Sequence, residues 1–130
     1  MTVVEIVWKG RFEPTPASIG AVRHIVEAHL ELVSPTCREA AVLVASELAT
    51  NVVRHAGTPY DVRLIVARSV SIEVTDSGVG IPQLRHAAPG GGGGLGLQLV
   101  SALASAWGVE HQSGAKTVWA EVPIEPLSHA

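Results

Sequence analysis

The chain has 130 residues, a formal net charge of −3, and 47% hydrophobic against 16% charged residues. This composition excludes a disordered, highly charged segment, and the length is that of one domain, residues 1–130, that can bury its own core. The mildly acidic balance argues against direct binding to nucleic acid, which needs a basic surface. Glycine is the unusual residue, because most of the 13 glycines lie between Gly78 and Gly96.

The cysteine, histidine and apolar patterns exclude several further classes of protein. Cys37 is the one cysteine in the sequence, which excludes an intramolecular disulfide and a thiolate metal cluster. The histidines are scattered without the spacing of a metal motif. No apolar run is long enough to span a bilayer, and the first residues do not resemble a signal peptide. We therefore expect a cytoplasmic protein with no membrane partner.

Apolar periodicity and turn residues predict the elements in chain order. Ser18 is expected to cap the first helix, Gly57 to close the second, and Gly114 to turn the chain between the last two strands. The expected elements are a strand over 3–12, helices over 18–33 and 35–55, strands over 62–67 and 71–75, a loop over 76–93, a helix over 95–106, and strands over 109–111 and 117–122.

The order of these elements predicts the fold class. Arg68-Ser69 forms a short hairpin connection, which favours antiparallel neighbours over the strict alternation of a doubly wound sheet. Three helices are enough to cover one face of such a sheet. The sequence therefore predicts an α/β (α+β) two-layer sandwich, with a mixed, largely antiparallel sheet and three helices on one face.

Glu47 and Asn51 are the first candidate functional residues. They are four residues apart on the second predicted helix, so they share one side of it, with Arg54 close by. A carboxylate and an amide oxygen one turn apart can place a proton acceptor beside a Mg²⁺ ligand. A solvated polar face is the alternative, and the helix pattern alone favours it. Asn51 weighs against that alternative, since asparagine is a poor helix former among Ala, Leu and Val.

Asp76 begins the second candidate motif, Asp76-Ser77-Gly78-Val79-Gly80, at the end of a predicted strand. Its carboxylate can accept a hydrogen bond from an amine, while glycines without side chains let the backbone approach a flat ring. A plain Asp-Ser-Gly turn is the alternative, and the motif alone does not decide between the two.

A run of five glycines, Gly90 to Gly94, precedes Leu95-Gly96-Leu97 at a predicted helix start. Free N–H groups and the positive dipole end of a helix suit a phosphate. A run of five glycines has a large conformational entropy, so we expect that a ligand is needed to order it. A flexible linker is the alternative. A dinucleotide fingerprint is excluded because no strand leads directly into the run, and Gly114-Ala115-Lys116-Thr117 lacks the upstream glycine of a Walker A motif.

Together these motifs resemble those of the GHKL (Bergerat-fold) ATPases in order and spacing. The three motifs are Glu47-x-x-x-Asn51, Asp76-x-Gly78-x-Gly80 and Gly92-Gly93-Gly94-Leu95-Gly96-Leu97. Within that superfamily the chain is similar to the bacterial anti-sigma-factor serine/threonine kinases, from about Phe12 to Val122. The resemblance implies a histidine-kinase-like ATPase fold that binds ATP and Mg²⁺.

The resemblance also implies a role for each motif residue. Asn51 would coordinate the Mg²⁺ that bridges the phosphates, and Glu47 would be the general base for an attacking serine hydroxyl. Asp76 would hydrogen-bond the adenine amino group, with Gly78 and Gly80 shaping the adenine pocket. Such positioning and charge neutralisation are what phosphoryl transfer depends on.

The remaining implied contacts surround the phosphates and the far side of the base. Residues 81–94 would form an ATP lid, in which Arg85 and His86 are the side chains able to reach phosphate. Thr117 would contact the adenine directly or through water. Lys116 and Arg54 are either phosphate contacts or solvated charges. The N–H groups at the helix start would contact phosphate, which adds Gly92, Gly94, Leu95, Gly96 and Leu97 to the nucleotide-binding residues.

The implied function is an ATP-dependent serine/threonine kinase that sequesters a sigma factor and phosphorylates an anti-anti-sigma (STAS-type) protein on serine. The resemblance is also compatible with a homodimer of this chain. One alternative is a non-catalytic, ATP-gated protein-binding module of the same fold. Another is a histidine-kinase-like ATPase subunit whose partner supplies the histidine, because residues before Pro14 indicate a strand and no helical phosphoacceptor segment.

Overall fold

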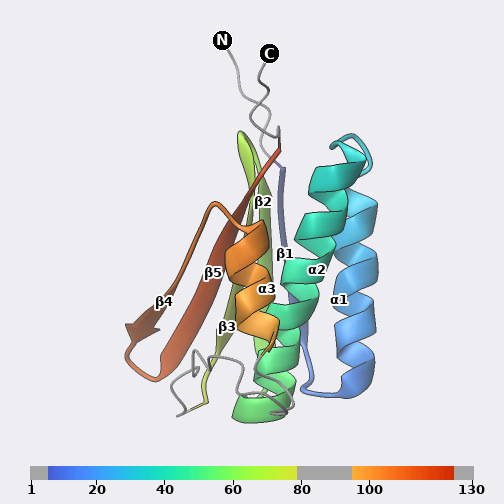
Figure 1. Ribbon diagram of the computed structural model, residues 1–130. Coiled ribbons are helices and arrows are strands. Elements are labelled where there is room, and N and C mark those ends of the chain that lie inside the picture. The colour runs from blue at the N-terminus through green and yellow to red at the C-terminus, as the bar shows by residue number, and fades with distance from the viewer. Residues whose placement is uncertain (1–5, 79–94, 125–130) are drawn as a thin grey trace.

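The computed structural model describes residues 6–78 and 95–124, which form two layers (Figure 1). A sheet makes one layer, and the described helices pack together on one of its faces. The elements are β1 (Ile6–Phe12), α1 (Pro16–His29), α2 (Pro35–Asn51), the π-helical turn η1 (Val52–Ala56), β2 (Tyr60–Val66), β3 (Ser69–Asp76), α3 (Leu95–Leu103), β4 (Ala106–Gln112) and β5 (Ala115–Pro123).

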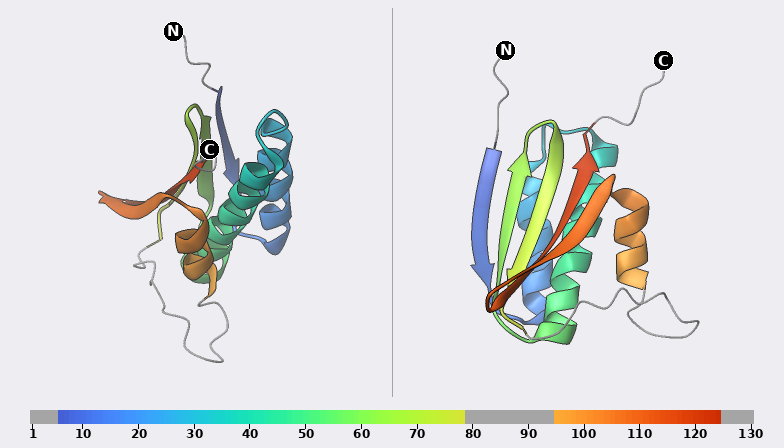
Figure 2. Two further views of the ribbon diagram at one scale, coloured as in Figure 1. Left: turned by 45° about the horizontal axis from the view of Figure 1, so that its top comes forward. Right: turned by 90° about the vertical axis from the view of Figure 1, so that its left-hand side faces the viewer.

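The described strands form one five-stranded sheet in the order β1-β2-β3-β5-β4. Each neighbouring pair is antiparallel, so the predicted two-layer sandwich with a largely antiparallel sheet is confirmed. The right-hand view of Figure 2 shows the sheet facing the viewer, with the helices behind it. Because β3 and β5 are antiparallel neighbours, the end of β3 lies beside the start of β5.

The core lies between the sheet and the helices. Successive side chains of a strand point to opposite faces, so every second residue of β2, β3 and β5 points into it. Burying a Val or Leu side chain fully is worth roughly 1.5–3 kcal/mol, so this layer fixes the helices against the sheet. The buried apolar residues include Val22, Val26, Leu30, Val44, Leu48, Val62, Leu64, Val70, Ile72, Val74, Val118, Ala120 and Val122.

The start of α1 differs from the prediction, because Thr15 rather than Ser18 is the N-cap. Thr15 Oγ1 accepts a hydrogen bond from the Ser18 N–H at 3.3 Å, and Pro16 suits the first helical position, where no N–H is needed. Ser18 is buried instead, and its hydroxyl lies 2.6 Å from the Tyr60 hydroxyl. The helix ends at His29, before the predicted residue 33.

The second helix begins at Pro35 as predicted, with Ser34 as its N-cap. After Asn51 it widens into η1, where the Gly57 N–H donates to the Val52 carbonyl oxygen at 2.9 Å. Gly57 has a φ of 66°, the left-handed conformation that glycine adopts without strain, so its predicted closing role is confirmed. π-helical turns are rare and are frequent at functional sites, which makes this helix end notable.

α3 and β4 have different bounds from those predicted. α3 ends at Leu103 and β4 begins at Ala106, so the expectation of helix up to residue 106 is wrong. Gly108 in β4 lies beneath the Trp119 ring, and a Cβ at this position would lie 2.9 Å from that ring. This packing between strands outweighs the local helical period. The predicted turn at Gly114 is confirmed by its φ of 73°.

Candidate functional site

A narrow cavity lies between two parts of the fold. On one side are α2 and η1, and on the other are the end of β3 and the start of β5. Its volume is about 20 Å³, which is room for one water molecule. The cavity therefore has to widen before it can hold a larger ligand. The residues that line it are Leu48, Asn51, Val52, His55, Asp76, Lys116 and Val118.

Asp76 is the buried carboxylate of this cavity and the last residue of β3. Its Oδ1 atom accepts a hydrogen bond from the Gly78 N–H at 2.8 Å, which fixes the orientation of the carboxylate. Its Oδ2 atom is buried and has no hydrogen-bond donor. The Lys116 ammonium group lies 3.5 Å from Oδ2 as an ion pair, but Oδ2 makes no hydrogen bond, so it can accept one from a ligand with a donor.

Gly78 is placed by a close approach between two segments. A Cβ at this position would lie 2.7 Å from the Ala56 Cβ and 3.1 Å from the Ala56 Cα. Real Cβ atoms do not tolerate the shorter of these distances, so the backbone after β3 can pass the end of η1 only with glycine here. The close approach at Gly78 thus keeps Asp76 near η1, which directly follows Asn51 at the end of α2.

Asn51 is the last residue of α2 and lines the same cavity as Asp76. Its Nδ2 atom is buried without a hydrogen-bond partner. Two residues that are far apart in the sequence, each with a buried polar atom that makes no hydrogen bond, therefore line one cavity, as expected for a binding site. Glu47, one turn earlier on α2, is half-buried and is not one of the residues that line the cavity.

Lys116, rather than Thr117, comes to the cavity from β5. Lys116 lies opposite Asp76 in the β3–β5 register, and its Nζ atom is 3.5 Å from Asp76 Oδ2. The Thr117 side chain is on the other face of the sheet, where its hydroxyl lies 2.7 Å from the Thr75 hydroxyl. The alternation of β5 indicates the position of Lys116. Val118 and every second residue after it are buried, which places Lys116 on the same core-facing side.

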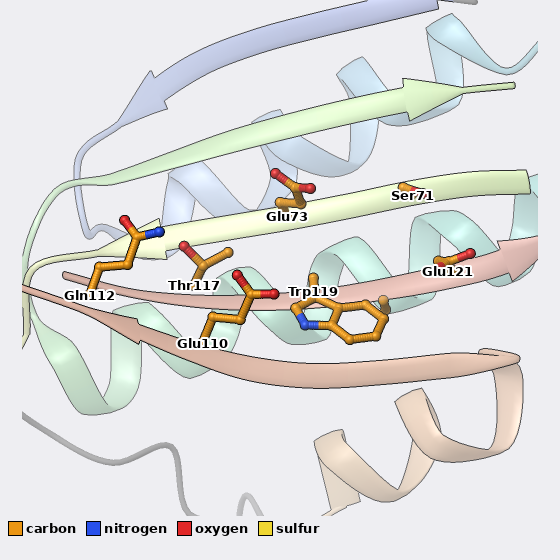
Figure 3. A pocket seen from close by; sticks show the side chains of 8 residues that line it. Ser71, Glu73, Glu110, Gln112, Thr117, Trp119 and Glu121 are labelled. Carbon is orange, nitrogen blue, oxygen red and sulfur yellow. The ribbon is translucent and has the colours of Figure 1, made fainter.

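The open face of the sheet has a wider hollow of about 380 Å³ (Figure 3). Figure 3 shows Glu73, Thr117 and Trp119 pointing from neighbouring strands to this face, with the helices behind the sheet. Glutamates dominate its charged lining, so it does not suit phosphate. Among the described residues that are predicted to bind nucleotide, only Thr117 lines this hollow. The lining residues are Ser71, Glu73, Glu110, Gln112, Thr117, Trp119, Ala120 and Glu121.

The predicted phosphate-binding helix start is present, because α3 begins at Leu95. The backbone N–H groups of Leu95, Gly96 and Leu97 thus lie in the first helical turn, where such groups lack intrahelical acceptors. The Leu97 side chain is buried. Gly80, Gly92, Gly94 and the whole predicted lid over residues 81–94, with Arg85 and His86, lie outside the described residues.

The described residues suit Mg²⁺ only as a companion of phosphate. Among residues 6–78 and 95–124, no group of three or more His, Cys, Asp or Glu side chains is placed to hold a metal ion. The Asn51 amide oxygen is the predicted ligand at the cavity. Mg²⁺ commonly takes one or two protein ligands, with phosphate oxygens and water completing its shell, so this donor set fits the ion only when it arrives with a nucleotide.

Cys37 and Tyr60 are the titratable groups that burial perturbs most clearly. Burial raises the pKa of the Cys37 thiol, which makes a reactive thiolate unfavourable. Burial also raises the pKa of the Tyr60 hydroxyl, although its hydrogen bond with Ser18 acts in the opposite direction. Neither residue lines the cavity, so neither is part of the candidate site.

A solved structure with a TM-score of 0.70 shares this fold. The chain matches the RsbU and RsbW domains of Rv1364c from Mycobacterium tuberculosis with a TM-score of 0.70 at 19% identity, over 93% of this chain and 33% of that chain. It thus spans about a third of the length of that chain. The histidine kinase domain of a blue-light activated histidine kinase from Erythrobacter litoralis EL346 gives a TM-score of 0.47 at 21% identity, over 83% and 60% of the two chains.

Comparisons of sequence identify the family. A search of curated protein sequences gives no significant match. In the described part of the chain, no helix is long and apolar enough to cross a membrane. The family model of the histidine kinase-like ATPase domain matches residues 12–122, which include α2, the cavity and both strands beside it. The chain therefore belongs to the histidine kinase-like ATPase domain family.

Proposed function

We propose that the chain binds Mg²⁺-ATP at the cavity and transfers the terminal phosphoryl group to serine on a partner protein. The observation that carries the proposal is the buried Asp76 Oδ2 atom, which makes no hydrogen bond and belongs to a residue that lines the same cavity as Asn51. A base with an exocyclic amino group supplies the missing donor. Family membership supports ATP as the nucleotide.

The neighbouring elements supply the other parts of the proposed reaction. The first turn of α3 would donate backbone N–H groups to the phosphates. The Asn51 amide oxygen would hold Mg²⁺, which supplies positive charge that neutralises the phosphates when it is bound. Glu47 would accept the proton of the serine hydroxyl, so that the chain itself mainly positions the reactants.

We further propose that the partner is part of a sigma-factor switch in the cytoplasm. The chain would sequester a sigma factor and phosphorylate a STAS-type anti-anti-sigma protein on serine. The motif order and spacing of the anti-sigma-factor kinases support this proposal, together with the shared fold with a structure that includes an RsbW domain.

Calorimetry with ATP and Mg²⁺ tests the binding step. Asp76→Asn exchanges an acceptor for an amide that can also donate, so ATP affinity should fall about tenfold or more. Asp61→Asn is the matched control, because Asp61 is exposed on β2 and does not line the cavity. Unchanged affinity in the Asp76 variant would remove the adenine site from the cavity.

Transfer of radiolabelled phosphate to candidate anti-anti-sigma proteins tests the catalytic step. Glu47→Gln should keep ATP affinity and lose transfer, whereas Glu39→Gln, at an exposed position of the same helix, should keep both. A non-catalytic, ATP-gated binding module is the second candidate function, and it is favoured by the absence of Glu47 from the cavity lining. Absence of transfer by the wild-type chain to every cognate partner, with ATP still bound, would establish that alternative.

A further inference from the structure

Lys116 is a buried cation in a row of apolar residues. Its side chain is 7% exposed, and it shares the core-facing side of β5 with Val118 and Ala120. Moving an ammonium group out of water is costly, and the ion pair with the Asp76 carboxylate helps to repay that cost. An apolar side chain at this position would leave the Asp76 carboxylate buried without its cation, so Lys116 belongs to the charge balance of the cavity as well as to the core-facing row of β5.

The Asp76–Lys116 pair presents an acceptor and a donor side by side. Asp76 Oδ2 and Lys116 Nζ are 3.5 Å apart, and both residues line the same cavity. Asp76 Oδ1 is already occupied by the Gly78 N–H, so the remaining oxygen is held in a fixed direction. Each member of the pair can therefore face one neighbouring atom of a flat ligand that enters the cavity.

The Watson–Crick edge of adenine matches this arrangement atom for atom. Its 6-amino group is a donor, and the adjacent ring nitrogen N1 is an acceptor. The corresponding edge of guanine carries an oxygen at position 6 and a hydrogen on N1, so both contacts would be reversed. An acceptor and a donor that read two adjacent atoms thus select adenine and reject guanine, whereas a carboxylate alone reads one atom.

We propose that Lys116 is the second base-reading residue of this chain, donating a hydrogen bond to adenine N1 while Asp76 accepts from the 6-amino group. This inference rests on the proposed ATP binding. The cavity of about 20 Å³ has to widen to admit adenine, and the Lys116 ammonium would then move from the Asp76 oxygen to the ring nitrogen. The flexible four-carbon stem of lysine allows this short movement.

Calorimetry with ATP and with 1-deaza-ATP, in which a C–H group replaces N1, tests the contact directly. The wild-type chain should bind 1-deaza-ATP about ten- to a hundredfold more weakly than ATP, since a hydrogen bond from a charged donor is lost. In Lys116→Met the two ligands should bind with nearly equal affinity. Lys9→Met is the matched control, because Lys9 is exposed on β1 and should preserve the wild-type ratio.

The ratio of the two affinities is independent of a general loss of folding, and a thermal melt of each variant measures that loss separately. Lys116→Gln keeps a neutral donor and should retain part of the preference for ATP over 1-deaza-ATP. An equal preference in the wild type and in Lys116→Met would overturn the assignment, and would be the result if Lys116 contacted phosphate. Failure of the wild type to bind ATP at all would instead reject the proposed function on which the inference rests.

Discussion

The backbone at Gly78 passes so close to Ala56 that a Cβ at position 78 would lie 2.7 Å from the Cβ of Ala56. This approach joins the segment after β3 to the end of η1, and so it sets the position of Asp76 relative to α2. The candidate site is thus held by backbone proximity as well as by side-chain contacts.

Gly78→Ala should destabilise the chain and weaken ATP binding together. Overpacking of this kind typically costs about 1–3 kcal/mol, and relieving it by a shift of the backbone would move Asp76. Denaturant unfolding and ATP calorimetry measure the two effects. Gly20→Ala is the control, because a Cβ at Gly20 in α1 meets nothing within 4 Å. That substitution should be neutral or stabilising by up to about 1 kcal/mol. Recovery in the double variant with Ala56→Gly would identify the steric contact as the cause.

The buried contact between Ser18 and Tyr60 should be coupled in a double-mutant cycle. Tyr60→Phe removes one hydroxyl of a pair 2.6 Å apart and should lower the free energy of unfolding by about 1 kcal/mol. The second substitution, Ser18→Ala, should cost less in that background than in the wild type, because the hydroxyl has already lost a partner. Strictly additive losses in chemical denaturation would show that the two hydroxyls do not interact energetically.

Stability should fall at high pH because of Tyr60. Burial raises the pKa of its hydroxyl in the folded chain, so the unfolded chain releases this proton first, near the ordinary tyrosine pKa of about 10. The contribution of Tyr60 is therefore complete below about pH 10 and is lost as the pH rises through the higher folded value. Tyr60→Phe should show a smaller loss of the free energy of unfolding between pH 9 and pH 11, on the order of one titrating group. Identical pH profiles for both proteins would contradict the assignment.

Cys37 should be unreactive toward thiol reagents while the chain is folded. The thiol is buried, and burial raises its pKa, so both access and thiolate formation are unfavourable. A disulfide reagent at pH 8 should label the native chain slowly and the urea-unfolded chain rapidly. Fast labelling without denaturant would show that the N-terminal turn of α2 opens locally.

The sequence predicts the layers and the elements of this fold because alternation and helical periodicity are local properties. The cap of α1 is different, since both Thr15 and Ser18 suit an N-cap: Pro16 at the first helical position favours Thr15, and Ser18 instead contacts the distant Tyr60. Likewise, the helical period over residues 104–106 gives way to strand pairing, which brings Gly108 under Trp119. Competition between local preference and long-range packing cannot be resolved from a short window of sequence.

The candidate site shows the same division. Asn51 and Asp76 are predicted as nucleotide-binding residues, and the structure brings them to one cavity. Their meeting depends on η1 and on the close approach at Gly78, neither of which has a periodic signal in the sequence. The alternation of β5 does place Lys116 on the core-facing side, so its position was accessible from the pattern. The roles assigned to Glu47 and Thr117 stay predictions.

The strand order has a consequence for the biosynthesis of the chain. β1, β2 and β3 can pair as soon as they leave the ribosome, whereas β5 enters the sheet beside β3 only after α3 and β4 have been made. Asp76 therefore gains its contact with Lys116 only when β5 pairs with β3. If the Asp76–Lys116 pair reads ATP, the nucleotide can be read by both residues only after β5 has joined the sheet beside β3.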